Sequence, residues 1–203
     1  MKTGTGAARR GNRLLTVGTD CSAGKKYTAL AIARDMEKRG INGQFCATGQ
    51  TGKLIANRGI ALDAVVADFI SGAVEWLSPE HKDDDQWDVI EGQGSIFHPA
   101  FAGVSLGLLH GAQADAFIVC HEPTRTNMRA VSTPLPTIQE VIDQTVALGS
   151  RTNPNIRCVG ISVNTSNLPA EEVENYLSNL SQEFGVPAVD PVKGSTDLII
   201  DLL

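Results

Sequence analysis

Gly18-Thr-Asp-Cys-Ser-Ala-Gly-Lys-Lys-Tyr-Thr28 is the stretch that decides the fold. It follows a short apolar run, Leu14 to Val17, and it opens a helical pattern that continues to Lys38. A strand, a glycine-bounded loop and a helix in this order are typical of a phosphate-binding loop, in which backbone N–H groups and a lysine face an anion. We therefore expect a polyphosphate ligand beside Lys25. The alternative is an ordinary glycine-containing turn between a strand and a helix.

This loop departs from the pattern G-x-x-x-x-G-K-[ST]. Thr19 stands at the first glycine position, and Lys26 stands where a Ser or Thr hydroxyl would bind Mg²⁺. Thr28 is a poor substitute, because two residues along a helix turn a side chain by about 200°. We expect good anion binding, no metal site and no Mg²⁺-dependent phosphoryl transfer. The residues expected to bind the cofactor are Thr19, Asp20, Cys21, Ser22, Ala23, Gly24, Lys25, Lys26 and Asn164.

The amino-acid composition is typical of a globular protein, and we expect its cysteines to be reduced. The chain has 203 residues, enough for a sizeable core, and 42% of them are apolar. It contains no apolar run that could span a bilayer and no secretory signal pattern. The four cysteines lie far apart without a C-x-x-C pair, which disfavours a zinc site or a disulfide framework. We expect a cytoplasmic protein without a membrane partner.

Charge is spread unevenly along the chain. The formal net charge is −6, and residues 1–13 hold four basic residues and no acidic one, so the remainder is distinctly acidic. An acidic body argues against nucleic acid as a partner. We interpret residues 1–12 as a glycine-rich linker stub and residues 13–203 as one P-loop α/β domain.

Strand-like and helix-like segments alternate through the rest of the chain. This alternation predicts a P-loop three-layer α/β sandwich with a mostly parallel sheet. A T-x-x-E capping box at Thr137 to Glu140 marks one helix start. Strands are expected at 13–18, 43–47, 87–91, 115–121, 156–163 and 186–190. Helices are expected at 24–39, 61–77, 102–111, 137–149, 169–184 and 195–202.

Four loops that follow strands are rich in glycine and polar residues. In open α/β sheets, ligands bind at the carboxyl ends of the strands, so these loops should share an edge with the phosphate loop. The loops are ATGQTG (47–52), EGQGSIFHP (91–99), CHEPTRTNMR (120–129) and VNTS (163–166).

Asp68, Glu91 and His98 are the candidate catalytic groups. Glu91 ends an apolar strand and precedes two glycines, which favours a functional carboxylate over an acid that caps a turn. His98 suits proton transfer near pH 7, and a structural loop histidine is an equal alternative. Asp68 interrupts an apolar pattern, which fits either a structural ion pair or a catalytic carboxylate.

Gln50, Thr51, Arg125 and Arg129 are the candidate substrate-binding residues. Both arginines lie in one polar loop, and a guanidinium suits bidentate recognition of carboxylate or phosphate. A pair of surface arginines is the alternative. Asn164 follows the last long strand, where P-loop proteins often contact a nucleobase edge, or where an Asx residue simply forms a turn.

Two families share motifs with this chain. G-T-D-x-x-x-G-K and E-G-x-G resemble dethiobiotin synthetase and related P-loop enzymes, without the Thr after Gly-Lys. A closer resemblance, to the DgcN family, runs through nearly the whole chain. The motifs that carry it are TVGTDCSAGKKYTAL, ATGQTG, VVADFISGAVEWLSP, WDVIEGQGSIFHPAFAGVSLGLLHG, CHEPTRTNMR and ISVNTS.

The DgcN resemblance implies transfer of an acetyl group from acetyl-CoA to the amino group of D-glutamate or a similar D-amino acid. It also implies a small-molecule substrate, a homo-oligomer and a further N-terminal domain ahead of the P-loop domain. Acyl transfer agrees with the missing Mg²⁺-binding hydroxyl, because no phosphate bond is broken. The alternatives are an enzyme of dethiobiotin synthetase type, with ATP and Mg²⁺ held by Glu91 or Asp20, and a non-catalytic module that binds CoA or a nucleotide.

Overall fold

Within residues 2–203, the part of the chain that the computed structural model describes, six strands form a sheet of order β2-β3-β1-β4-β5-β6. Every neighbouring pair is parallel, so all carboxyl ends meet at one edge. In the register, Leu14 lies between Val89 on β3 and Ala116 on β4. The strands are β1 (Asn12–Gly18), β2 (Gly43–Cys46), β3 (Trp87–Ile90), β4 (Ala116–His121), β5 (Arg157–Val163) and β6 (Ala188–Val189).

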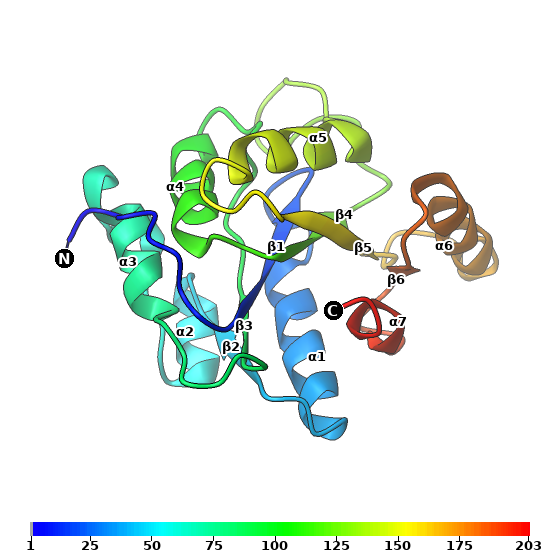
Figure 1. Cartoon of the computed structure of the whole chain (residues 1–203). Helices are drawn as coiled ribbons and strands as arrows, with labels where there is room; N and C mark the ends of the chain where they lie inside the picture. Colours follow the sequence, from blue (N-terminus) through cyan, green and yellow to red (C-terminus); the bar gives the residue numbers. More distant parts are fainter. Residues whose placement is uncertain (1) are drawn as a thin grey trace.

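Helices cover both faces of this sheet and make the three layers that the sequence predicts (Figure 1). α1 and α7 pack on one face, and α4 and α5 pack on the other, where α3 lies against α4. α6 flanks β5 and β6. The helices are α1 (Lys25–Lys38), α2 (Gln50–Ala56), α3 (Ile70–Leu77), α4 (Ala102–Ala112), α5 (Ile138–Gly149), α6 (Ala170–Phe184) and α7 (Asp197–Ile200).

Alternation along the strands separates two hydrophobic clusters. Leu15 and Phe117 belong to the cluster under α3, α4 and α5, whereas Leu14 and Ile118 belong to the cluster under α1 and α7. All four side chains are at most 1% exposed. Burial on both sides explains why these strands read as continuous apolar runs. No helix in residues 2–203 has the length and apolarity needed to cross a lipid bilayer.

The predicted strands are confirmed, and so is the capping box of α5, with its reciprocal bonds between Thr137 and Glu140.

The single helix expected over 61–77 is wrong. Two 3-10 turns, η1 (Leu62–Ala64) and η2 (Ala67–Phe69), precede α3. The β-branched pair Val65 and Val66 takes extended backbone conformations between these turns, as its propensity favours. α2 was missed, because its first turn lies in the polar segment 47–52.

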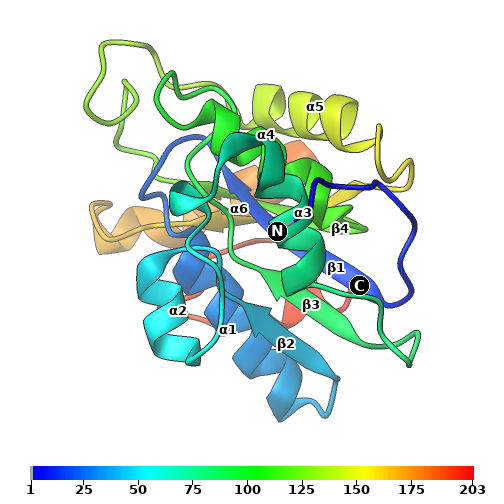
Figure 2. The same ribbon diagram turned by 90° about the vertical axis from the view of Figure 1, so that its left-hand side faces the viewer.

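Residues 2–11, most of the segment interpreted as a linker, form no helix or strand but are fixed by specific contacts. In both views this segment runs beside α3 (Figure 1, Figure 2), and the backbone N–H groups of Thr5 and Gly6 donate to Glu75 at 2.8 and 2.9 Å. Arg9 donates to Gln113 at 2.8 Å and to the carbonyl oxygen of Ser78. The segment therefore packs onto the domain.

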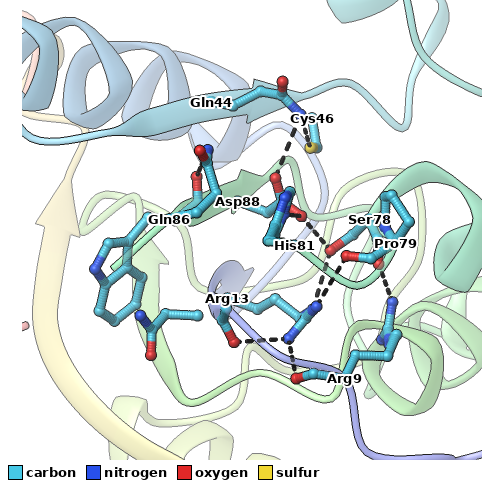
Figure 3. Close-up of polar contacts among 12 residues, drawn as sticks. Arg9, Arg13, Gln44, Cys46, Ser78, Pro79, His81, Gln86 and Asp88 are labelled. Atoms are coloured by element: carbon cyan, nitrogen blue, oxygen red, sulfur yellow. Dashed lines mark hydrogen bonds and ion pairs between the residues drawn. The ribbon is translucent and has the colours of Figure 1, made fainter. Parts of the chain in front are cut away.

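Arg13, only 2% exposed, closes the amino edge of the sheet (Figure 3). Its guanidinium donates to Ser78 Oγ at 3.1 Å and to four backbone carbonyl oxygens. The Ser78 hydroxyl donates in turn to the buried carboxylate of Asp88, which also lies 2.8 Å from Nε2 of His81. This network holds the amino ends of β1 and β3 together, opposite the edge that carries the phosphate loop.

Candidate functional site

The phosphate loop connects β1 to α1 at the carboxyl edge of the sheet. Gly24 takes a left-handed conformation, with φ of 108°, as the residue just before α1, and no side chain caps the helix. Ser22 is also left-handed, with φ of 53°. The first N–H groups of α1 consequently remain free to face an anion, beside the positive end of the helix dipole.

A cavity of about 480 Å³ opens in front of this loop, within the range of ligand-binding sites. It brings together seven of the predicted site residues: Cys21, Ser22, Gly24, Lys25, Lys26, Glu91 and Asn164. It also contains residues that sequence reasoning missed: Tyr27, Asp63, Gln93, Phe101 and Val104. Tyr27 and Gln93 are next to predicted residues in the sequence, so they could have been predicted from that position. Asp63, Phe101 and Val104 belong to other segments, which only the fold brings to the cavity.

Glu91 lies at the end of β3 on the far side of the cavity, and only 5% of it is exposed. Its Oε2 accepts the backbone N–H groups of Thr48 and Gly49, at 3.0 and 3.1 Å. These two bonds orient the carboxylate. No hydrogen bond or ion pair from residues 2–203 engages its other oxygen, Oε1, so Glu91 lines the cavity with one carboxylate oxygen unengaged.

Lys25 and Lys26 differ in their surroundings. Lys25 is 6% exposed, and its Nζ donates to the carbonyl oxygen of Asp20 at 2.7 Å. Burial lowers the pKa of Lys25, because removal of the ammonium group from water disfavours its charged form. Lys26 is half-buried, lines the cavity and lies over the Tyr27 ring, with Nζ 4.9 Å from its centroid. An anion in the cavity would therefore meet two ammonium groups.

Thr28 points away from the phosphate position, as its place on the helix predicts. Its side chain is fully buried, with Oγ1 2.7 Å from the hydroxyl of Ser162 on β5 and 3.1 Å from the carbonyl oxygen of Gly24. Its hydroxyl is thus bonded inside the protein, and Lys26 occupies the place of the usual Mg²⁺ ligand.

Arg125 does not have the free guanidinium expected of a substrate clamp. It contacts Asp20 Oδ2 at 2.8 Å and Glu122 Oε2 at 3.0 Å, and it donates to the carbonyl oxygens of Cys21 and Ser22. The expected role is corrected on this point, because these bonds use the guanidinium to hold the phosphate loop. Asp20 is equally engaged, since its carboxylate also accepts the N–H groups of Cys21 and Arg129.

His98 is 1% exposed, and both of its ring nitrogens are bonded. Nε2 lies 3.0 Å from the carbonyl oxygen of Arg129, Nδ1 accepts the N–H of Ala100 at 3.1 Å, and the ring stacks on Phe101. These bonds favour the structural loop histidine, the second of the two roles expected for His98, over a proton-transferring one. Asp20, Cys21 and His98 offer ligand atoms within 4.8 Å of one another, but an ion there would have to displace these bonds.

Four other predicted residues lie outside this cavity. Asp68 is exposed in η2 and lines a separate hollow beside residues 3–6, so the structure does not bring it near Glu91. Gln50 and Thr51 are exposed in the first turn of α2. Arg129 is anchored through its backbone to Asp20 and His98, and its side chain is exposed.

Two buried residues and one half-buried histidine lie behind the loop. Thr19 and Ala23 are at most 1% exposed, and Thr19 Oγ1 lies 3.1 Å from Nδ1 of His121 at the end of β4. Burial lowers the pKa of His121 to about 4, so this ring is neutral at pH 7. Thr19 and Ala23 therefore support the loop from within.

Comparison with known proteins identifies the family of this chain. A family model described as "Domain of unknown function (DUF1611_C) P-loop domain" matches residues 2–200. Two proteins named D-glutamate N-acetyltransferase are similar over 199 residues: one from Pseudoalteromonas sp at 53% identity, and one from Tritonibacter scottomollicae at 51%. Each alignment covers 98% of this chain and 60% of the relative, so the chain spans about 60% of their length.

Solved structures have the same fold. A DUF1611 family protein from Anabaena variabilis superposes with a TM-score of 0.92 at 33% identity, over 99% of this chain and 60% of that one. Cobyrinic acid a,c-diamide synthase from Mycobacterium smegmatis, with bound ADP and magnesium, has a TM-score of 0.53 at 14% identity, over 91% of this chain and 88% of that one. The second likeness concerns the fold alone.

Proposed function

Because the chain belongs to the family described as the DUF1611_C P-loop domain, we propose that it is the acetyl-CoA-binding part of an N-acetyltransferase. The acceptor is the amino group of D-glutamate or a similar D-amino acid. The names of the two relatives support this reaction, and the cavity in front of the phosphate loop supports the donor. CoA contains a pyrophosphate, which fits the N–H groups of α1 together with Lys25 and Lys26.

One observation carries the proposal. The same cavity is lined by a phosphate loop that lacks the metal-binding hydroxyl and by Glu91, which has one unengaged carboxylate oxygen. Phosphoryl transfer on P-loops uses a Ser or Thr to hold Mg²⁺, and here Lys26 replaces it while Thr28 is bonded to Ser162. Acyl transfer leaves the phosphates intact and needs only that they be held. It also needs a base, and we assign that role to Glu91, which lines the cavity.

In this mechanism Glu91 takes a proton from the substrate ammonium. The resulting amine attacks the thioester carbonyl, and the tetrahedral intermediate carries an oxyanion that needs a positive or hydrogen-bonding partner. Backbone N–H groups of the glycine loops supply that partner, because Lys26 already holds the pyrophosphate in this scheme. The C–S bond then breaks, the nitrogen gives its second proton to the departing CoA thiolate, and Glu91 releases its proton to solvent.

Arg129 is the candidate for the substrate carboxylates in this scheme, because Arg125 is committed to the phosphate loop. Its exposed guanidinium starts from a backbone that Asp20 and His98 fix. The proposal also includes a homo-oligomer in the cytoplasm. Sedimentation velocity tests the first of these and cell fractionation the second.

Two measurements test the proposed function. The first is the melting temperature of the chain with acetyl-CoA or with ATP, each with and without Mg²⁺, because a ligand that binds only the folded state raises it. We expect a rise with acetyl-CoA that needs no metal. The second is release of free thiol from acetyl-CoA with D-glutamate and with L-glutamate. A rise only with ATP and Mg²⁺ would overturn acyl transfer in favour of phosphoryl transfer.

A further inference from the structure

A second cavity, of about 340 Å³, adjoins the first and takes no part in the proposed chemistry. It lies between the start of α1, the end of β5 and the turn that follows β6. The two cavities share Gly24, Tyr27 and Asn164 in their linings. A ligand whose phosphates lie on the loop could therefore extend one end into each cavity.

The walls of this second cavity suit a flat, aromatic group. Tyr27 is 59% exposed and Val192 is 74% exposed, and Pro191 adds a rigid apolar surface beside them. Apolar surface of this size gains stability when a ligand covers it, and a tyrosine ring stacks well on a planar base. Asn164 Oδ1 accepts the N–H of Ser166 at 3.2 Å, so the two N–H donors of its amide remain for the edge of a base.

Lys193 is the cation of this cavity, and its position is fixed. Its Nζ lies 2.9 Å from Thr165 Oγ1, a neutral partner, and no ion pair from residues 2–203 neutralises it. Asp190 is near, but its oxygens are engaged with the N–H groups of Val192 and Lys193 and with the hydroxyl of Thr165. The turn built by Asp190 thus presents an ammonium group that forms no ion pair within residues 2–203, beside the apolar walls.

Lys193 lines the second cavity and not the one in front of the phosphate loop, so it lies beside the base end of a nucleotide whose 5′ phosphates rest on the loop. A second phosphate on the ribose would supply a partner for it. CoA carries a 3′-phosphate, whereas ADP and ATP do not. We infer that the second cavity binds the 3′-phosphoadenosine end of CoA, with the base against Tyr27 and Val192 and the 3′-phosphate on Lys193. This inference rests on the proposed function, because it names how the same donor is selected.

Calorimetric titration of the full chain tests this inference, with CoA, 3′-dephospho-CoA and ADP as ligands. The wild-type protein should bind CoA about tenfold more tightly than dephospho-CoA, the usual scale for one charge-assisted hydrogen bond. Lys193→Ala should weaken CoA binding by the same factor and leave the other two ligands unchanged. Tyr27→Ala should weaken all three. Lys82→Ala is the matched control, because it removes an exposed lysine at the opposite edge of the sheet.

Each other outcome is decisive. Equal binding of CoA and dephospho-CoA by the wild-type protein, or an equal loss of both in Lys193→Ala, would overturn the role of Lys193 and leave the proposed acetyl donor intact. Absence of CoA binding would overturn the donor as well. A melting curve for each variant, together with Lys193→Gln as a second substitution, separates a loss of contact from a loss of folding.

Discussion

Arg125 ties the loop after β4 to the phosphate loop through Asp20, with Nη1 of the arginine 2.8 Å from Oδ2 of the aspartate. The same nitrogen donates to the carbonyl oxygen of Cys21 at 2.7 Å. Asp20 is fully buried and the Arg125 side chain is 22% exposed. The phosphate loop is therefore held in an anion-binding shape by the protein itself, before any ligand arrives.

Loss of this ion pair should cost both stability and affinity. We expect Arg125→Ala to lower the free energy of unfolding by about 3 kcal/mol, since it leaves the buried charge of Asp20 unpaired. Arg125→Lys should recover little, because one ammonium cannot make the same set of bonds. Urea unfolding measures the effect. Arg129→Ala is the control, expected within about 0.5 kcal/mol of wild type, and a similar loss there would contradict the assignment.

Glu91→Gln should separate catalysis from binding. The amide keeps an oxygen that can accept the N–H groups of Thr48 and Gly49, but it cannot take a proton. We expect kcat for acetyl transfer to fall about 10²–10⁴-fold, with the Kd for CoA nearly unchanged. Stopped-assay kinetics and calorimetry on the same protein provide the two values. An unchanged kcat would remove Glu91 as the base.

Lys26→Thr should restore a metal-binding hydroxyl to the phosphate loop. The wild-type chain is expected to bind its ligand without Mg²⁺, whereas the variant should bind ATP more tightly when Mg²⁺ is present. Thermal shift assays with ATP, with and without Mg²⁺, compare the two proteins. Lys53→Thr is the matched control, because Lys53 is exposed on α2. Metal-dependent binding by wild type would contradict the reasoning.

Substitution of Gly52 should disturb Glu91 indirectly. A Cβ atom at Gly52 would overlap Oε2 of Glu91, whereas one at Gly103 in α4 would meet nothing within 4 Å. We expect Gly52→Ala to destabilise the protein by about 1–3 kcal/mol and to lower turnover. Gly103→Ala should stabilise it by about 0.5–1 kcal/mol, because alanine is the better helix former. Thermal unfolding and turnover of the pair check both directions.

His121 should make the protein less stable as the pH falls from 7 towards 4. Its pKa is lowered by burial to about 4, so between pH 6.5 and 4 the unfolded state binds more protons than the folded state. This difference removes about 2 kcal/mol of stability between pH 7 and 5. His121→Gln should flatten the stability profile in that window, as measured by urea unfolding. An equally steep profile in the variant would exclude His121 as the cause.

The sequence by itself determined the element order, the parallel sheet, the phosphate loop and the edge at which the site forms. It could do so because these depend on local signals: apolar runs, glycine positions, a capping box and the pattern around Gly24-Lys25. The position of Thr28 on α1 was likewise predictable, since helical geometry alone turns it away from the loop. The prediction failed at 61–77, where two valines take extended conformations between short turns, and it missed α2.

Only the tertiary structure decided which of the polar side chains are free. From the sequence, Arg125 could be a substrate clamp and His98 a base. In the structure Arg125 forms an ion pair with Asp20, which lies more than 100 residues away in the chain. The ring of His98 is bonded to the backbone carbonyl of Arg129. Within residues 2–203, by contrast, Glu91 keeps one carboxylate oxygen without a hydrogen bond, and Lys193 forms no ion pair. Whether a polar atom is already hydrogen-bonded or free for a ligand depends on partners that are distant in sequence. No local sequence pattern encodes those partners.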